Sequence, residues 1–275
     1  MAQAAAALGI TKIRITGGEP LVRDGMVDLV YALSDIAGID EITLTTNGSL
    51  LPAYAQRLVK AGLTRVNVSL DSLCPDRFHQ ITRIGHLKDT LDGIAAAQEA
   101  GLVPIKLNAV ILRGINDDEA ASLAAMSKQG FHMRFIEWMP IGSTTQDFES
   151  VFVPSEEIRT RIENSLGPLY MLRQEGPATL YRLTGSHTDH GHIGFISTFS
   201  RPFCTTCNRI RLTADGKLRP CLLSPIEIDV KNSLRAKAGD EEIEKLLVRA
   251  IKEKPLSHNM AEQSPTDRAM SQIGG

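Results

Sequence analysis

The chain has 275 residues, of which 43% are hydrophobic, and a formal net charge of −2 at pH 7. That is enough apolar material for one large domain, or for one domain with an appendage. The near-neutral charge argues against binding to long nucleic acids, although local arginine clusters could still bind a small polyanion. The apolar runs are short, and residues 1–12 lack the features of a signal peptide. We therefore expect a cytoplasmic protein without a membrane span.

The first half of the sequence alternates between strand and helix patterns. Strands are expected at 12–16, 41–46, 65–70, 103–112 and 132–138, with helices at 26–36, 52–61, 87–100 and 117–128. Repeated βαβ units predict an α/β fold with a parallel sheet whose carboxyl ends share one rim. Polar residues gather at the expected ends, at 17–19, 45–47, 69–71, 106–108 and Glu137. We therefore expect a binding site at that rim.

Beyond Pro140 the pattern changes. A helix is expected at 155–164, followed by short strands at 169–172, 179–183, 192–198, 209–213 and 217–221. These strands predict a small antiparallel layer, closed by helices at 226–237 and 240–253 and by an extended polar tail. The chain thus divides into a first region, 1–150, and a second, 151–275. Residues 2–8 resemble the end of an amphipathic helix directly before the first strand, so we expect one strand to be missing from the sheet.

Three of the four cysteines, Cys204, Cys207 and Cys221, lie close together, whereas Cys74 stands alone as a free thiol. The dipeptide at 215–216 predicts a two-residue hairpin that pairs 214 with 217, 212 with 219 and 210 with 221. That register returns Cys221 to the base of the hairpin, near Cys207. Clustered thiols in a reducing compartment favour a metal site over a disulfide.

Two kinds of metal site suit this hairpin. An iron–sulfur cluster with three cysteine ligands leaves one iron open to a substrate. A structural zinc site needs a fourth ligand, which His187, His190 or His192 could supply. Arg209 and Arg211 share one face of the outgoing strand. Beside a metal site, their guanidinium groups could bind phosphates or a purine edge; the alternative is a solvated strand face.

Six segments, in this order, resemble the GTP 3′,8-cyclases of molybdenum-cofactor biosynthesis: KIRITGGEPLVR, LTTNGSLL, RVNVSLDSL, KLNAVILRGIND, RFIEWMPIG and CTTCNRIRLTADGKLRPCL. GGEP marks the wider radical-SAM group. The three-cysteine hairpin with its RIR segment, and the double-glycine end, are specific to this cyclase. The resemblance covers essentially the whole chain.

This resemblance implies a partial (β/α)6 radical-SAM barrel, here without its first strand, over residues 1–150. A smaller C-terminal α+β region, 151–275, would hold an auxiliary [4Fe-4S] cluster, with GTP between the two regions. The implied reaction converts GTP to (8S)-3′,8-cyclo-7,8-dihydroguanosine 5′-triphosphate. A 5′-deoxyadenosyl radical made from SAM takes a hydrogen from C3′, and the carbon radical closes onto C8. A homodimer that passes its product to the next enzyme of molybdopterin synthesis is also implied.

The resemblance further implies roles for single residues. The SAM-binding residues would be Gly18, Ser69 and Met139. The GTP-binding residues would be Arg14, Thr45, Lys106, Arg209, Ile210 and Arg211. The auxiliary cluster ligands would be Cys204, Cys207 and Cys221. The Gly274-Gly275 tail would reach into the active site, where only glycine is small enough to pass.

One departure from the family pattern limits the expected activity. The initiating cluster of the family needs a Cys-x3-Cys-x2-Cys motif, and no cysteine precedes Cys74. We therefore expect a fragment that binds GTP and the auxiliary cluster but does not cleave SAM, with the second [4Fe-4S] cluster present only in the full-length protein. The alternatives are a radical-SAM peptide maturase, which would carry more C-terminal cysteines, and a non-catalytic nucleotide- or zinc-binding protein on a degenerate barrel.

Overall fold

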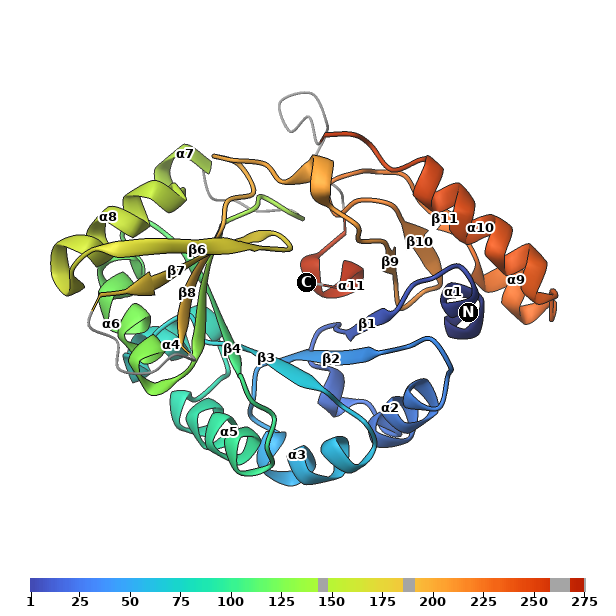
Figure 1. Cartoon of the computed structure of the whole chain (residues 1–275), viewed down its shortest axis with the longest axis horizontal. Coiled ribbons are helices and arrows are strands. Elements are labelled where there is room, and N and C mark those ends of the chain that lie inside the picture. Colours follow the sequence, from blue (N-terminus) through green and yellow to red (C-terminus); the bar gives the residue numbers. More distant parts are fainter. Residues whose placement is uncertain (143–147, 185–190, 258–267, 275) are drawn as a thin grey trace.

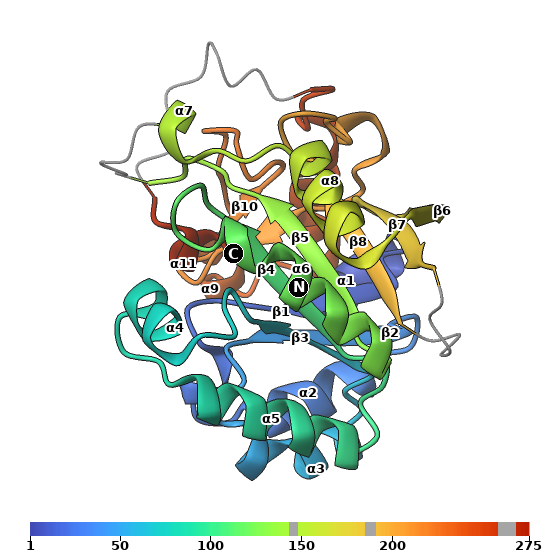
Figure 2. The same cartoon turned by 90° about the vertical axis from the view of Figure 1, so that its left-hand side faces the viewer.

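The computed structural model describes residues 1–142, 148–184, 191–257 and 268–274. Its strands form an arc with helices on the outer side, and the C-terminal end of the chain lies inside the arc (Figure 1). Figures 1 and 2 both show helices α2, α3 and α5 packed on one side of strands β1–β3. No helix in these residues is long and apolar enough to span a membrane.

The first five strands are parallel and follow one another in chain order, as predicted. They are β1 (Lys12–Ile15), β2 (Glu41–Thr46), β3 (Arg65–Ser69), β4 (Lys106–Ile111) and β5 (His132–Glu137). The helices between them are α2 (Met26–Ser34), α3 (Leu51–Lys60), α4 (Pro75–Thr82), α5 (Leu87–Glu99) and α6 (Ala120–Ala125). Helix α4 was not predicted; it begins at Pro75, where a missing N–H costs nothing. Short 3-10 turns flank α6, at Asp117–Glu119 and Met126–Gln129.

The strands after residue 150 do not form the separate antiparallel layer that was predicted. Strand β8 (His192–Ile196) pairs in parallel with β5 and continues the main sheet. All five of its residues are buried, as is typical of an inner strand covered on both faces. Strands β7 (Ala178–Leu183) and β6 (Leu169–Glu175) follow it antiparallel, giving the order β1-β2-β3-β4-β5-β8-β7-β6.

A small second sheet lies next to the C-terminal helices. It contains β9 (Arg211–Leu212), β10 (Lys217–Arg219) and β11 (Ile228–Asp229). Strand β11 and the short helix α9 (Lys231–Arg235) replace the single helix predicted at 226–237. The remaining helices are α1 (Ala2–Ala7), α7 (Phe148–Val151), α8 (Ser155–Leu166), α10 (Asp240–Lys252) and α11 (Met270–Ile273). The last of these lies in the tail that was predicted to be extended.

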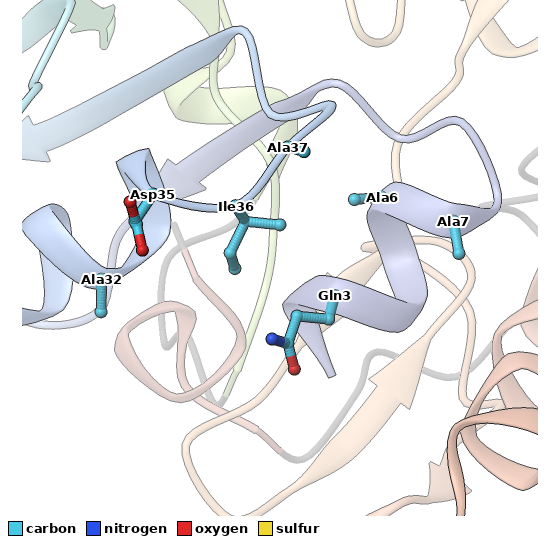
Figure 3. Close-up of a pocket in the computed structure, with 7 residues that line it drawn as sticks. All are labelled: Gln3, Ala6, Ala7, Ala32, Asp35, Ile36 and Ala37. Carbon is cyan, nitrogen blue, oxygen red and sulfur yellow. The ribbon is translucent and has the colours of Figure 1, made fainter.

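Helix α1 belongs with the C-terminal elements. Its Ala4 and Ala5 are buried in a core that includes Leu218, Ile243 and Leu247. A groove of about 440 Å³ separates α1 from the end of α2 (Figure 3). Its lining residues are Gln3, Ala6, Ala7, Ala32, Asp35, Ile36 and Ala37. Six of these seven side chains carry no charge, and the groove holds none of the predicted site residues.

The two faces of the main sheet differ in chemistry. Alternate residues such as Ile42, Leu44 and Val66 belong to the apolar core under the helices. The residues between them are polar: Thr43 lies beside Arg65, and Asn108 beside Arg134, in the parallel register. Parallel sheets are usually apolar on both faces. A polar inner face therefore indicates a space built for a polar ligand.

Candidate functional site

Basic side chains from three separate segments lie within electrostatic range of one another. Arg14 comes from β1, Arg134 from β5, and Arg209 and Arg211 from the segment around β9. Burial, followed by the charges of these three neighbours, lowers the pKa of Arg14 to about 10. Burial and the charge of Arg209 likewise lower the pKa of Arg211 to about 10. Arg14 is nevertheless solvent-exposed at its surface. Many protein atoms therefore lie around its side chain, but they do not seal it from solvent. Cations held this close together form the environment of an anion site.

Lys106 and Arg134 form the most buried part of this cluster. Their residues are 4% and 6% exposed, and both side chains donate to the same oxygen, Oε1 of Glu175, at 2.7 Å and 2.8 Å. Burial and the nearby Arg134 lower the pKa of Lys106 to about 8, although Glu175 opposes this shift. Burial disfavours the charged form of Glu175, but Lys106 and Arg134 outweigh it and lower its pKa to about 2.

Sequence reasoning missed Arg134. The available signal was its position on a polar face: Arg134 lies beside Asn108 in the register, in a strand whose neighbouring residues Met133 and Phe135 are fully buried. A charged side chain at an alternate position of an otherwise apolar inner strand points away from the helices. Such a residue needs a partner or a ligand.

The basic residues lie along the strands rather than only at the carboxyl rim, where they were expected. Lys106 is the first residue of β4, and Arg14 is the third of the four residues of β1. Arg14 Nε donates to Thr43 Oγ1 on the neighbouring strand at 3.3 Å, and this bond holds the Arg14 side chain against the sheet. Thr45, near the end of β2, accepts a hydrogen bond from Asn67 at 3.3 Å. The anion site therefore extends inward from the rim.

The three predicted SAM-binding residues do lie at carboxyl ends of strands. Ser69 ends β3, Met139 follows β5, and Gly18 follows β1. A Cβ added to Gly18 would meet no protein atom within 4 Å, so the space beside it is open. The turn is fixed by Glu19, which accepts from Thr46 Oγ1 at 2.8 Å and from Asn47 N at 2.7 Å. The GGEP turn is thus held against β2 with its glycine facing free space.

Glu137, another expected rim residue, has a different role. Its side chain is fully buried and accepts hydrogen bonds from the backbone N–H groups of Ser155, Phe199 and Ser200 at 2.8 Å, 2.8 Å and 3.0 Å. The Ser200 hydroxyl also donates to it. Glu137 therefore fastens the end of β5 to the start of α8 and to the loop after β8.

The cysteine hairpin has a different register from the predicted one. Leu212 pairs with Leu218 and Arg211 with Arg219, and Thr213 N donates to Lys217 O at 2.9 Å. The turn therefore contains three residues, 214–216, rather than two. Gly216 has φ +83, as the left-handed last position of such a turn requires. Each predicted pair is wrong by one residue.

The three thiols remain free and partly exposed. Cys207 N donates to Cys204 O at 3.1 Å across a 3-10 turn (Cys204–Thr206), and Cys221 follows β10. In the described part of the chain, no group of three or more His, Cys, Asp or Glu side chains is arranged to hold a metal ion. The structure thus does not gather the three sulfurs as the hairpin register predicted. The donor types still suit an iron–sulfur cluster, and Arg211 lies within electrostatic range of Cys221 and Cys207.

The histidines give the zinc alternative little support. His187 and His190 lie outside the described residues. His192 is buried at the start of β8, where its ring contacts His132 with 3.1 Å between Nδ1 and Nε2. It is therefore already paired within the sheet.

The C-terminal tail enters the arc, as predicted for Gly274. Arg211 Nη1 donates to Gly274 O at 2.6 Å. A Cβ on Gly274 would lie 2.7 Å from Thr16 Oγ1, and its φ is +79. Glycine is therefore required by both space and backbone conformation. Arg268 anchors the segment before it through Asp215 Oδ2 at 2.9 Å and Glu227 Oε1 at 2.6 Å. Gly275 lies outside the described residues.

Comparison with known proteins shows the family to which this chain belongs. The model of the Radical SAM superfamily matches residues 1–126, and that of Molybdenum Cofactor Synthesis C matches residues 131–260. The GTP 3′,8-cyclase of Pelotomaculum thermopropionicum is 50% identical over 99% of this chain and 84% of its own length. The chain belongs to the GTP 3′,8-cyclase family. A relative of the same name from Moorella thermoacetica is also 50% identical, over 100% of this chain and 85% of its own length.

Family membership confirms the predicted fold class and identifies the cofactor types. The α/β fold with a parallel-rich sheet is that of a radical-SAM domain. SAM and [4Fe-4S] clusters are the cofactors that membership implies. The two matched families meet between residues 126 and 131, whereas the main sheet continues through β8 to β6. Part of the second region is thus built into the first.

Proposed function

We propose that this chain belongs to an enzyme that catalyses the radical-SAM cyclisation of GTP to (8S)-3′,8-cyclo-7,8-dihydroguanosine 5′-triphosphate in molybdenum cofactor biosynthesis, and that its 275 residues, which contain no Cys-x3-Cys-x2-Cys motif, supply the GTP and auxiliary-cluster sites. The observation that carries this proposal is the basic cluster on the polar inner face, whose arginine and lysine pKa values are lowered by burial and mutual repulsion. Such a cluster is stabilised by a polyanion and matches the phosphates of a nucleotide. Family membership supports the reaction class.

In this proposal the basic cluster orients GTP. Lys106 and Arg134 bind the phosphate chain, and Arg14 lies between them and the hairpin. Arg209, Ile210 and Arg211 lie beside the guanine, and Thr45 contributes from β2. Because Arg14, Thr45, Lys106 and Arg134 lie on strands of the main sheet before the ligand binds, little conformational entropy is lost at those positions. The nucleotide is thereby held in one orientation.

The opposite side of the substrate faces the carboxyl ends of the strands. Gly18, Ser69 and Met139 are the proposed SAM contacts there, and open space beside Gly18 supports a close approach of backbone to ligand. SAM and the [4Fe-4S] clusters, when bound, supply the radical chemistry of the reaction. The chain supplies the positions of its two ligands and a site closed by the Gly274 tail, which limits access of water.

The cysteines and the assembly complete the proposal. Cys204, Cys207 and Cys221 are the proposed ligands of the auxiliary [4Fe-4S] cluster, supported by their free thiols and by Arg211 nearby. A homodimer, and delivery of the product to the next enzyme of molybdopterin synthesis, are proposed from the family alone. The expected cytoplasmic location stays a prediction.

The first experiment is anaerobic reconstitution with iron and sulfide, followed by iron counting and EPR spectroscopy with and without GTP. We expect a cluster whose EPR spectrum changes when GTP is added. The triple variant with Cys204, Cys207 and Cys221 changed to Ser should lose that response. Tight stoichiometric zinc, or a cluster spectrum indifferent to GTP, would overturn the proposal. Adding SAM and a reductant, with mass spectrometry to detect the cyclised nucleotide, then tests the expectation that these 275 residues do not cleave SAM on their own.

A further inference from the structure

The hairpin between β6 and β7 carries a carboxylate to the inner face of the sheet. Glu175 is the last residue of β6 and pairs with Ala178 across the turn, where Gly176 has φ +57. The hairpin is joined to β5 through β7 and β8, so its position is fixed by the main sheet. The location of the carboxylate is therefore a property of the fold.

Glu175 bridges the two most buried cations of the site. Oε1 accepts from Lys106 Nζ at 2.7 Å and from Arg134 Nη2 at 2.8 Å, while Oε2 accepts from Arg173 at 3.2 Å. The side chain of Glu175 remains 32% exposed, whereas those of Lys106 and Arg134 are 5% and 7% exposed. The carboxylate can thus move away, but the two cations cannot follow it into solvent.

An ammonium and a guanidinium group that both donate to one carboxylate oxygen can donate in the same way to a terminal phosphate oxygen. In the proposed orientation of GTP the guanine lies near Arg209 and Arg211, so the phosphate chain runs toward β4 and β5. Its end meets Lys106 and Arg134, where Glu175 already provides an anionic oxygen. The terminal phosphate and the carboxylate cannot share these two donors without strong repulsion.

We propose that Glu175 is a specificity-determining residue that holds Lys106 and Arg134 until the third phosphate of a nucleoside triphosphate displaces it. This inference rests on the proposed function. A diphosphate lacks the group that competes with the carboxylate, so it leaves the pairs with Glu175 intact. The carboxylate thus weakens binding of GTP itself while it keeps the buried cations paired in the empty site.

The test compares GTP and GDP binding by isothermal titration calorimetry, without Mg²⁺, in the wild type and in E175Q. Removing one negative charge next to the terminal phosphate should tighten GTP binding at least about tenfold at low salt. GDP binding should change less than about twofold by the same reasoning. The effect on GTP should shrink as salt is added, because the pair remains partly exposed. The matched control is E157Q, which removes an equally ion-paired carboxylate on α8 bonded to Arg113 and Arg161.

The binding results distinguish a specificity role of Glu175 from a structural role. Weaker or unchanged GTP binding in E175Q would overturn the inference, since a structural role of Glu175 predicts that result. Equal tightening of GTP and GDP would also overturn it, since a general electrostatic effect of the lost charge predicts that result. A wild-type protein that binds no GTP would overturn the proposed function as well, and so separates the two failures. If E175Q does not fold, as judged by circular dichroism, E175D serves instead. Its side chain is shorter by one methylene and does not reach the position of Oε1 between the two cations, so GTP binding should still tighten, and weaker binding would refute the role.

Discussion

Replacing Glu137 with Gln should destabilise the protein more than the change of one atom suggests. Oε1 of Glu137 accepts from Ser155 N and the Ser200 hydroxyl, and Oε2 accepts from Phe199 N and Ser200 N. A carboxamide retains only one oxygen, so two of the four donors face an NH2 group instead. A lost hydrogen bond to a charged group costs about 1.5–3 kcal/mol, so the free energy of unfolding should fall by at least about 3 kcal/mol.

Thermal unfolding followed by circular dichroism measures this loss. About 3 kcal/mol corresponds to a fall in Tm of roughly 6–12 °C for a chain of this size. The control is again E157Q: its surface pairs with Arg113 and Arg161 should contribute no more than about 1 kcal/mol each. S200A, which removes one donor, should give an intermediate Tm. If E137Q melted within about 4 °C of the wild type, the idea that this carboxylate fastens β5 to α8 would be wrong.

Three further predictions concern ligand contacts. G18A should fold normally, because its Cβ meets no protein atom, yet lose SAM affinity in equilibrium dialysis by about tenfold or more; unchanged affinity would place SAM elsewhere. Since the folded pKa of Lys106 is about 8, below its unfolded value, GTP affinity should fall as pH rises through 8, and the pH dependence should disappear in K106R. The stability of the ligand-free protein should instead rise above pH 8, because the unfolded state binds more protons there. G274V should expel the tail from its contact with Thr16 and make it cleavable in limited proteolysis, an effect that a tail already outside the arc would not show.

The sequence predicted local elements well and their partners less well. Strand 41–46 was predicted to the residue, because alternation and the following turn are local signals. The pairing of β8 with β5 could not be read from its sequence, since a short, mostly apolar run suits parallel and antiparallel neighbours alike. The hairpin register failed because Asp215-Gly216 fits both a two-residue turn and the end of a three-residue turn.

The candidate site shows the same division. Of the residues found through motifs, Gly18 lies beside open space and Arg14 lies among other cations, while their ligand contacts stay predictions. Arg134 and Glu175 were missed because no short motif contains both: they are 41 residues apart and meet only through the order of β5, β8, β7 and β6. Tertiary pairing, rather than local pattern, brings a cation and its counter-charge together.

The burial of Lys106 shows that the site is built at some cost to stability. A lysine whose pKa is lowered to about 8 by burial and a neighbouring arginine pays a desolvation penalty in the empty protein. K106M should therefore match or exceed the wild type in Tm without ligand, yet gain less stability from GTP. GTP at a hundred times its Kd should stabilise the wild type by about 2.7 kcal/mol, which raises Tm by roughly 5–11 °C. A K106M protein that melts well below the ligand-free wild type would show that this lysine stabilises the fold, and that its charge was not retained for a ligand.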